Sequence, residues 1–128
     1  MNIAYLATPY THHDPKVMEA RYLAVTEAAA YFFTSGQPVF SPITHTHPIK
    51  VAGGGQMLTS LFSEWAEYDY AMIRLLCSHV LVLTIDGWRE SVGVQAEIKY
   101  ATRLGKEVKL IVPESIGLLS VFPYLPPR

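Results

Sequence analysis

Short runs of aliphatic residues alternate with longer helical stretches along this chain. The runs lie at Ile3–Ala7 and at residues 37–41, 79–84 and 108–112. Strands buried on both faces of a parallel sheet have this composition, and the stretches between them fit right-handed helical crossovers. The alternation therefore predicts an α/β domain in which helices cover both faces of a mostly parallel sheet of four to five strands.

Helix signals separate these strands. The expected helices span Pro15–Thr34, residues 60–77 and residues 91–104, with a short helix within residues 115–120. Asp14 and Ser91 are typical N-caps. Residues 42–57 contain two prolines and three consecutive glycines, so a long loop is expected there, used as a lid or for binding. We therefore expect residues 1–128 to form one domain with a three-layer, flavodoxin-like α-β-α architecture.

Composition and charge exclude several classes of protein. Ten Lys and Arg against eleven Asp and Glu give a formal charge of -1, without a basic cluster that would bind nucleic acid or an anionic membrane. The longest apolar run is far shorter than the roughly 20 residues that span a bilayer, and the N-terminus has no basic signal region. Cys77, the only cysteine, is expected to be a buried hydrophobic residue of a helix in a reducing compartment. A cytoplasmic location is expected.

Ligands of open parallel sheets bind at the carboxyl ends of the strands. The segments that follow Ala7, Ser41 and Ile85 are therefore expected to share one site. Their side chains suited to ligand contact, which we interpret as substrate-binding candidates, are Thr8, Pro9, Tyr10, His45, Trp88 and Arg89.

Two carboxylates occupy helix faces that should be apolar. Asp69 falls within one apolar stripe, and Glu97 falls at the edge of the buried face of the next helix. The stripe contains Leu61, Trp65, Met72 and Leu76, and the second face contains Val94, Ile98, Ala101 and Leu104. Asp69 either bonds a loop amide or points into the cleft, and Glu97 either forms an ordinary ion pair or leans toward the ligand. Two carboxylates that flank one bond suit glycosidic chemistry, with one at the anomeric carbon and one handling the leaving group's proton.

The start of the third helix offers an anion site. Ser91 can cap this helix, and Gly93 lets a ligand approach its free backbone amides. Plain capping is the alternative, and the two are compatible. The glycines at 53–55 also precede a helix, but the Walker lysine and serine pattern is missing, so a flexible hinge is favoured there.

Histidines supply an alternative chemistry. His12, His13, His45 and His47 are expected on loops at the binding edge and are numerous enough to hold a metal. No HExxH motif or cysteine pair accompanies them, so ordinary loop or substrate contacts are favoured. A His-ligated metal hydrolase is therefore the less favoured function, and we expect neither a metal nor a cofactor.

Three features of the chain together resemble a known family. They are residues 4–10, with the sequence Ala-Tyr-Leu-Ala-Thr-Pro-Tyr, Asp69 in the middle helix, and the motif Ser91-x-Gly93-x-x-x-Glu97-x-x-x-Ala101. On these features the chain resembles the nucleoside 2-deoxyribosyltransferase superfamily, as an uncharacterised branch near the nucleoside 5'-monophosphate N-glycosidases. The resemblance covers nearly the whole chain.

The resemblance implies roles for individual residues. In that superfamily a glutamate matching Glu97 is the nucleophile that forms a covalent sugar intermediate, a tyrosine matching Tyr5 orients it, and an aspartate matching Asp69 assists at the base. The transferases usually carry aspartate where this chain has Ser91. The N-glycosidases are similar to this chain in having serine there, used toward the 5'-phosphate, which favours nucleotides over free nucleosides.

The function expected from these features is cleavage or transfer at the N-glycosidic bond of a nucleotide or nucleoside, with Glu97 as nucleophile and no cofactor. The alternative is a nucleotide-binding sensor module of the same fold that lacks turnover. Relatives of this kind often assemble so that a neighbour completes the pocket. The resemblance therefore implies a homo-oligomer, with the aromatic, Pro-rich residues 121–124 as a plausible contact surface.

Overall fold

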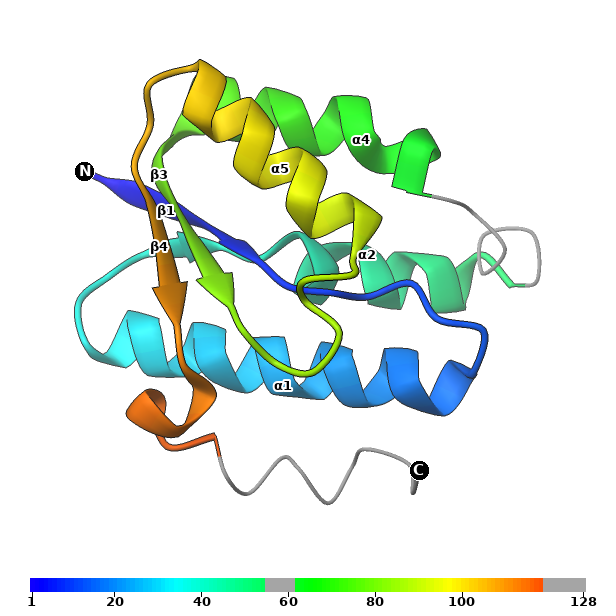
Figure 1. The fold of residues 1–128 in the computed structure, drawn as a ribbon. Helices are drawn as coiled ribbons and strands as arrows, with labels where there is room; N and C mark the ends of the chain where they lie inside the picture. Colours follow the sequence, from blue (N-terminus) through cyan, green and yellow to red (C-terminus); the bar gives the residue numbers. More distant parts are fainter. Residues whose placement is uncertain (55–61, 119–128) are drawn as a thin grey trace.

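The computed structural model describes residues 1–54 and 62–118. Its centre is a four-stranded parallel sheet with the order β2-β1-β3-β4 (Figure 1). The strands are β1 (Ile3–Ala7), β2 (Val39–Phe40), β3 (Cys77–Leu83) and β4 (Val108–Ile111). The helices are α1 (Pro15–Thr34), α2 (Pro42–Ala52), α4 (Phe62–Ala71) and α5 (Val92–Arg103), with a π-helical turn η1 (Met72–Leu76) and a 3-10 turn η2 (Pro113–Ile116).

Each face of the sheet buries its own apolar cluster. Successive residues of a strand point to opposite faces, so Leu6 of β1 packs in the cluster that contains Val25 of α1. Tyr5 belongs to the other cluster, together with Ile73 of η1 and Val94 of α5. Figure 1 shows α1 on one side of the sheet and α4 with α5 on the other. The protein therefore has the three-layer, flavodoxin-like α/β fold that the sequence predicts.

The first strand and the first helix match their predicted bounds. The side chain of Asp14 accepts a hydrogen bond of 2.9 Å from the backbone N–H of Lys16, as an N-cap does. Pro15 takes the first helical position, where a missing N–H costs nothing. The second strand is shorter than predicted. Of residues 37–41, only Val39–Phe40 form a strand of the sheet.

The predicted loop over residues 42–57 is wrong for most of its length, because helix α2 occupies Pro42–Ala52. Pro42 lies in the first turn, where proline is tolerated. Pro48 lies inside the helix, and tertiary packing offsets its cost because one helix face is buried. The buried residues around it are Thr46, His47 and Lys50. Gly53 ends the helix, whereas Gly55 lies outside the described residues.

Helix α4 and strand β3 meet at a π-helical turn. Cys77 was expected in the helix and is instead the first residue of β3. The ammonium group of Lys106 donates to the carbonyl oxygens of Ile73, Arg74 and Cys77 at 2.5, 3.0 and 2.7 Å. These bonds satisfy carbonyls that a helix end leaves unpaired, and they come from a loop far along the chain. Cys77 is buried as predicted, and burial raises the pKa of its thiol to about 11.

Two residues of the predicted apolar faces are exposed. Leu76 is 45% exposed and Leu104 is 38% exposed. The π-helical turn rotates the apolar stripe, so that Ile73 is buried in its place. Leu104 lies at the C-cap of α5, where the chain turns back toward the sheet. Leu61 and the expected caps Thr59 and Ser60 lie outside the described residues.

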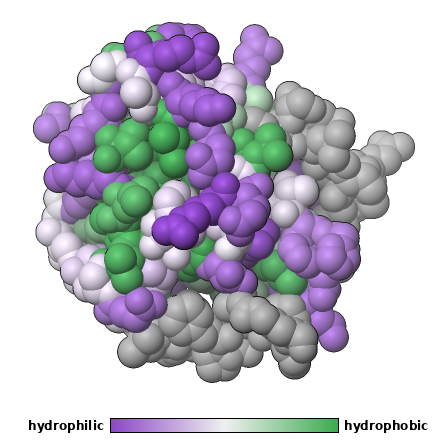
Figure 2. Space-filling view, viewed as in Figure 1, coloured by the Kyte–Doolittle hydropathy of each residue, from purple (hydrophilic) through white to green (hydrophobic). Residues whose placement is uncertain are grey.

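The C-terminal part of the described chain contributes the edge strand β4 to the sheet. Strand β4 ends one residue before the predicted limit, and η2 begins two residues before the short helix expected within residues 115–120. Residues 121–124 lie outside the described part of the chain. On the face that carries β4, Figure 2 shows apolar and polar surface side by side, and the exposed apolar side chains include Leu110 and Val112. No helix within residues 1–54 and 62–118 is long and apolar enough to cross a membrane.

Candidate functional site

A cavity of about 470 Å³ opens at the carboxyl ends of β1 and β3. This volume is within the range of small-molecule sites. The three segments expected to share a site all contribute, with the first turns of α2 in place of the predicted loop, and α4 completes the wall. The sequence-predicted residues on its wall are Thr8, Tyr10, Asp69, Ser91, Gly93 and Glu97.

Glu97 is buried in the second turn of α5, and its carboxyl accepts a hydrogen bond from the hydroxyl of Tyr5. Tyr5 reaches it because this β1 residue points to the α5 side of the sheet. Burial raises the pKa of Glu97 to about 8, the bond from Tyr5 opposes this rise, and the charge of Asp69 adds to it. Burial also raises the pKa of Tyr5 well above its usual range, so the phenol keeps its proton and remains a donor.

Asp69 of α4 is the second buried carboxyl on the cavity wall. Burial raises its pKa to about 7, and the positive charge of Lys50 opposes the rise. Near neutral pH the two carboxyls together therefore hold on the order of one proton. A general acid and a nucleophile require one protonated and one ionised carboxyl, and these pKa values place the proton more on Glu97 than on Asp69.

The N-terminal turn of α5 forms another part of the site. The hydroxyl oxygen of Ser91 accepts a bond of 3.1 Å from the N–H of Val94, which confirms the predicted N-cap. Ser91, Val92 and Gly93 all line the cavity. Helix N-termini carry backbone amides without helical partners and a partial positive charge, so this turn favours an anionic group of a ligand.

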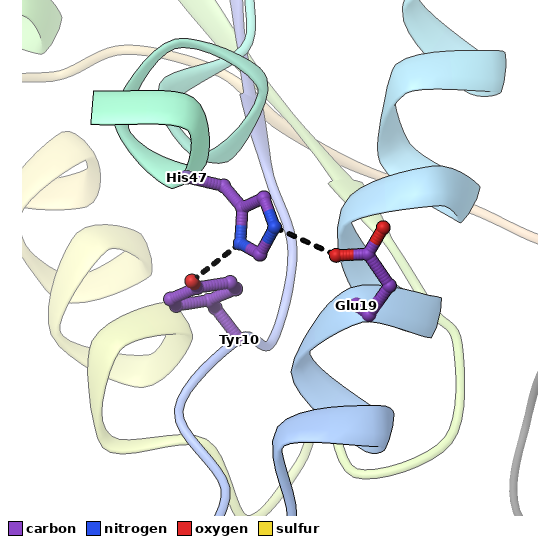
Figure 3. A network of polar contacts seen from close by, with 3 residues as sticks. All are labelled: Tyr10, Glu19 and His47. Carbon is purple, nitrogen blue, oxygen red and sulfur yellow. Dashed lines mark hydrogen bonds and ion pairs between the residues drawn. The ribbon is translucent and has the colours of Figure 1, made fainter. Parts of the chain in front are cut away.

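Tyr10 begins a chain of polar contacts that leads from the cavity wall to the surface (Figure 3). Its hydroxyl lies 2.7 Å from Nδ1 of His47, and Nε2 of His47 lies 2.8 Å from Oε2 of Glu19. A carboxylate oxygen only accepts, so Nε2 carries a proton. The His47 ring also stacks on Tyr22, with centroids 4.2 Å apart. These contacts fix the loop after β1 against α1 and α2.

Arg21 joins the loop after β1 to the turn after β3. Its Nη1 donates to the carbonyl oxygens of Tyr10 and Thr11 at 3.3 and 3.1 Å, and its Nη2 donates to that of Asp86 at 3.5 Å. Gly87 has a φ of 92°, and a Cβ atom there would lie 2.4 Å from Nη2 of Arg21. Glycine is therefore required at this point of the turn. Arg21 was not singled out from the sequence because it lies in a regular helix.

Four predicted binding residues do not line the cavity. Trp88 and Arg89 line a separate hollow of about 260 Å³, where the Arg89 guanidinium lies 5.3 Å from the centroid of the Trp88 ring. His45 is exposed, and its Nε2 lies 3.2 Å from the hydroxyl of Tyr68. Pro9 is buried away from the cavity wall. Only the end of the turn between β3 and α5 reaches the cavity, and His45 lies on the outer face of α2.

The cavity wall also contains side chains that the sequence patterns did not assign to the site, among them Lys50 and Trp65. Lys50 is 5% exposed, and its Nζ lies 5.0 Å from the ring centroid of Tyr10 and 5.5 Å from that of Trp65. A lysine in a predicted loop is expected in solvent, so Lys50 gave no signal. Helical spacing would have placed Thr46 and Lys50 on one face. Trp65 was interpreted as part of the apolar stripe.

The histidines do not gather. Within residues 1–54 and 62–118, no three His, Cys, Asp or Glu side chains come together as a metal site requires. His12 and His13 stack on each other with centroids 4.3 Å apart, whereas His47 is engaged by Tyr10 and Glu19.

This protein belongs to the general class of three-layer α/β proteins. Buried carboxyls and a helix N-terminus lie around its cavity. More narrowly, residues 2–112 match the family described as "Domain of unknown function (DUF1937)". The match covers most of the chain, so the chain belongs to this family. A comparison with curated proteins finds no match.

Proposed function

We propose that this protein cleaves or transfers the N-glycosidic bond of a nucleotide or nucleoside, with Glu97 as the nucleophile. The observation that carries the proposal is the convergence on one cavity of Glu97, held by Tyr5, and Asp69. The resemblance to the nucleoside 2-deoxyribosyltransferase superfamily implies the same three residues in these roles. Neither step of this chemistry requires a cofactor.

The first step forms a bond between a Glu97 carboxylate oxygen and C1' of the sugar. The bond from C1' to the base breaks, its electron pair leaves with the base, and Asp69 in its acid form gives that base a proton. Water then attacks C1', Glu97 leaves as a carboxylate, and the proton of the water returns to Asp69. A second base in place of water gives transfer, and two displacements at one carbon retain its configuration.

The N-terminal turn of α5 supports a nucleotide as the substrate. Ser91 and Gly93 lie on the same cavity as Glu97. A 5'-phosphate placed there meets backbone amides and the positive end of the helix. The phosphate would then fix the sugar so that C1' faces Glu97, which is how binding energy away from the reacting bond aids catalysis.

One observation favours a second candidate, a nucleotide-binding module without turnover. Burial raises the pKa of Glu97 to about 8, so this carboxyl is largely protonated at neutral pH. A protonated carboxyl is not a nucleophile. The enzyme therefore requires the ligand or a higher pH to ionise Glu97, whereas a binding module does not.

The test compares the wild-type protein with Glu97→Gln, which keeps the shape of the side chain and removes its charge. Both are incubated with ribo- and deoxyribonucleosides and their 5'-monophosphates, with and without an acceptor base, and free base is measured by chromatography. We expect base release by the wild-type protein that Glu97→Gln abolishes, and a sugar adduct on the intact wild-type protein in mass spectrometry. The control is Glu114→Gln, because Glu114 is exposed and outside the cavity. Nucleotide binding without Glu97-dependent base release would select the binding module.

A further inference from the structure

Three buried side-chain atoms have no hydrogen-bond partner among the described residues: Thr8 Oγ1, Trp65 Nε1 and Asp69 Oδ1. All three residues line the cavity. Buried polar atoms in folded proteins are nearly always bonded, so a group of unpaired ones calls for an explanation. Their gathering on a single cavity indicates that a ligand supplies the missing partners.

The chemistry of these atoms describes the group that they bind. The indole N–H of Trp65 can only donate, and the hydroxyl of Thr8 can also donate. The ammonium group of Lys50, buried between the rings of Tyr10 and Trp65, adds positive charge beside Asp69. This part of the wall therefore suits an acceptor atom of the ligand. The carboxyl of Asp69 has an acceptor oxygen in its acid form as well as when ionised, so it suits a donor next to that acceptor atom.

The residues around these unpaired atoms favour a planar base, and not a phosphate, as the group that binds there. The aromatic rings of Tyr10 and Trp65 belong to the cavity wall, and aromatic walls bind flat ring systems well. A phosphate beside the Asp69 carboxyl would be repelled whenever that carboxyl is ionised. The phosphate is better placed at the N-terminal turn of α5, which leaves the α4 side of the cavity for the base.

We propose that Trp65 and Thr8, assisted by Lys50, bind a carbonyl oxygen of the base, and that the cavity selects bases with a lactam edge. This edge is a carbonyl next to a ring N–H, and it occurs in uracil, thymine, hypoxanthine and guanine. Cytosine and adenine present an amino group where the carbonyl would lie, so donor would face donor. The inference rests on the proposed function to the extent that the ligand is a nucleotide or nucleoside.

The test measures binding without turnover, by calorimetry on the Glu97→Gln variant. The ligands are two matched pairs that differ at the base edge, dUMP against dCMP and IMP against AMP. We expect the lactam member of each pair to bind about tenfold more tightly or better, because sites built for one hydrogen-bond pattern reject its inverse. Adding Trp65→Phe keeps the aromatic ring and removes the N–H, and should reduce the preference several-fold. Thr8→Val removes the hydroxyl at nearly constant shape and should act in the same direction.

The control is Trp88→Phe, because Trp88 lies outside the cavity, and it should leave the preference unchanged. Equal affinities within both pairs, or a preference that survives both Trp65→Phe and Thr8→Val, would overturn the inference. Its failure is distinguishable from failure of the proposed function. If the protein binds lactam bases selectively but releases no base, the proposed enzymatic function is refuted and the lactam site stands. If it releases base equally from both members of each pair, the enzymatic function stands and the lactam site is refuted.

Discussion

The hydroxyl of Tyr5 donates a hydrogen bond to the carboxyl of Glu97. Burial raises the pKa of this carboxyl, and without the bond from Tyr5 the pKa would be higher still. Three residues act together here, because Tyr5 lowers the pKa of Glu97 while the charge of Asp69 raises it. A nucleophilic carboxylate and a proton donor can coexist in one cavity only if such neighbours divide the charge. The role of Tyr5 is therefore to hold Glu97 in position and to favour its ionised form.

Tyr5→Phe tests this role through the pH dependence of base release. The proposed reaction requires ionised Glu97 and protonated Asp69, so kcat/KM of the wild-type protein should depend on pH as a bell, with its maximum between the pKa of Asp69, about 7, and that of Glu97, about 8. The variant lacks the bond that lowers the pKa of Glu97, so its maximum should move to higher pH. At pH 7 its rate should fall by about tenfold or more, since one pKa unit is a factor of ten in the ionised fraction.

The matched control for this experiment is Tyr31→Phe, because Tyr31 is exposed on α1. It should leave the whole profile unchanged. A Tyr5→Phe profile that keeps the wild-type pH of maximum rate, with only a lower rate at every pH, would show that Tyr5 contributes packing and not charge control.

The candidate site was predictable where a residue violates its local pattern. Asp69 and Glu97 were found because carboxylates on apolar helix faces are costly, and Ser91 because a cap at a strand's carboxyl end is a known anion position. Lys50 and Trp65 obey their local patterns as a surface lysine and a core aromatic. Their place on the cavity wall depends on how α2 and α4 approach each other, which no local pattern encodes.

Among the elements, α2 shows most clearly where local signals fail. Its sequence contains Pro42 and Pro48 and ends in glycines, so the local preference is for a loop. The helix forms because its buried face packs against α1 and the loop after β1, with His47 bonded to both Tyr10 and Glu19. Elements with consistent local signals, such as β1, α1 and α5, were predicted nearly to the residue.

Pro48→Ala should therefore stabilise the protein. Pro48 is exposed, so little packing is lost, while alanine restores a helical N–H and removes the ring's clash with the preceding turn. We expect the free energy of unfolding in urea to rise by about 1–3 kcal/mol. Pro15→Ala is the control, because proline at the start of α1 breaks no helical bond, and it should be neutral or slightly destabilising. A loss of stability in Pro48→Ala would indicate that the backbone geometry that proline imposes on α2 is needed for packing.

The side-chain caps of α1 and α5 offer a test of the anion site. Asp14 caps α1 and Ser91 caps α5, but only Ser91 lies on the cavity. Asp14→Ala and Ser91→Ala should each lower the free energy of unfolding by about 1 kcal/mol. Only Ser91→Ala should also weaken binding of a nucleoside 5'-monophosphate relative to its nucleoside, measured by calorimetry on the Glu97→Gln background. If both substitutions changed the ratio of the two affinities equally, the 5'-phosphate would not bind at the N-terminus of α5.

On the scale of the whole molecule, the parallel sheet brings distant segments to one edge. The ends of β1 and β3 are neighbours because these strands pair along most of their length. The fold class and the edge at which a site lies therefore follow from the alternation of strands and helices. The cavity itself is lined by residues from three helices and two loops, so its size and lining required the structure.

Burying two carboxyls in one small domain should make the stability of the whole molecule depend on pH. Burial raises the pKa of Asp69 to about 7 and that of Glu97 to about 8, whereas both carboxyls have pKa values near 4 when unfolded. Between these limits the folded state binds more protons than the unfolded chain. Stability from these groups is therefore fully present below about pH 4 and is lost as pH rises through 7 to 8.

The expected result is a thermal midpoint that falls by several degrees between pH 5 and pH 8, and an Asp69→Asn, Glu97→Gln double variant whose midpoint falls less over the same range. The amides stay neutral at every pH, so the difference between the two curves isolates these carboxyls from the histidines and the surface acids. The variant should be the more stable protein at pH 8, because its folded state no longer buries two charged carboxylates. Parallel curves for the two proteins would mean that both carboxyls titrate normally in the folded state, and would remove the physical basis for a shared proton at the site.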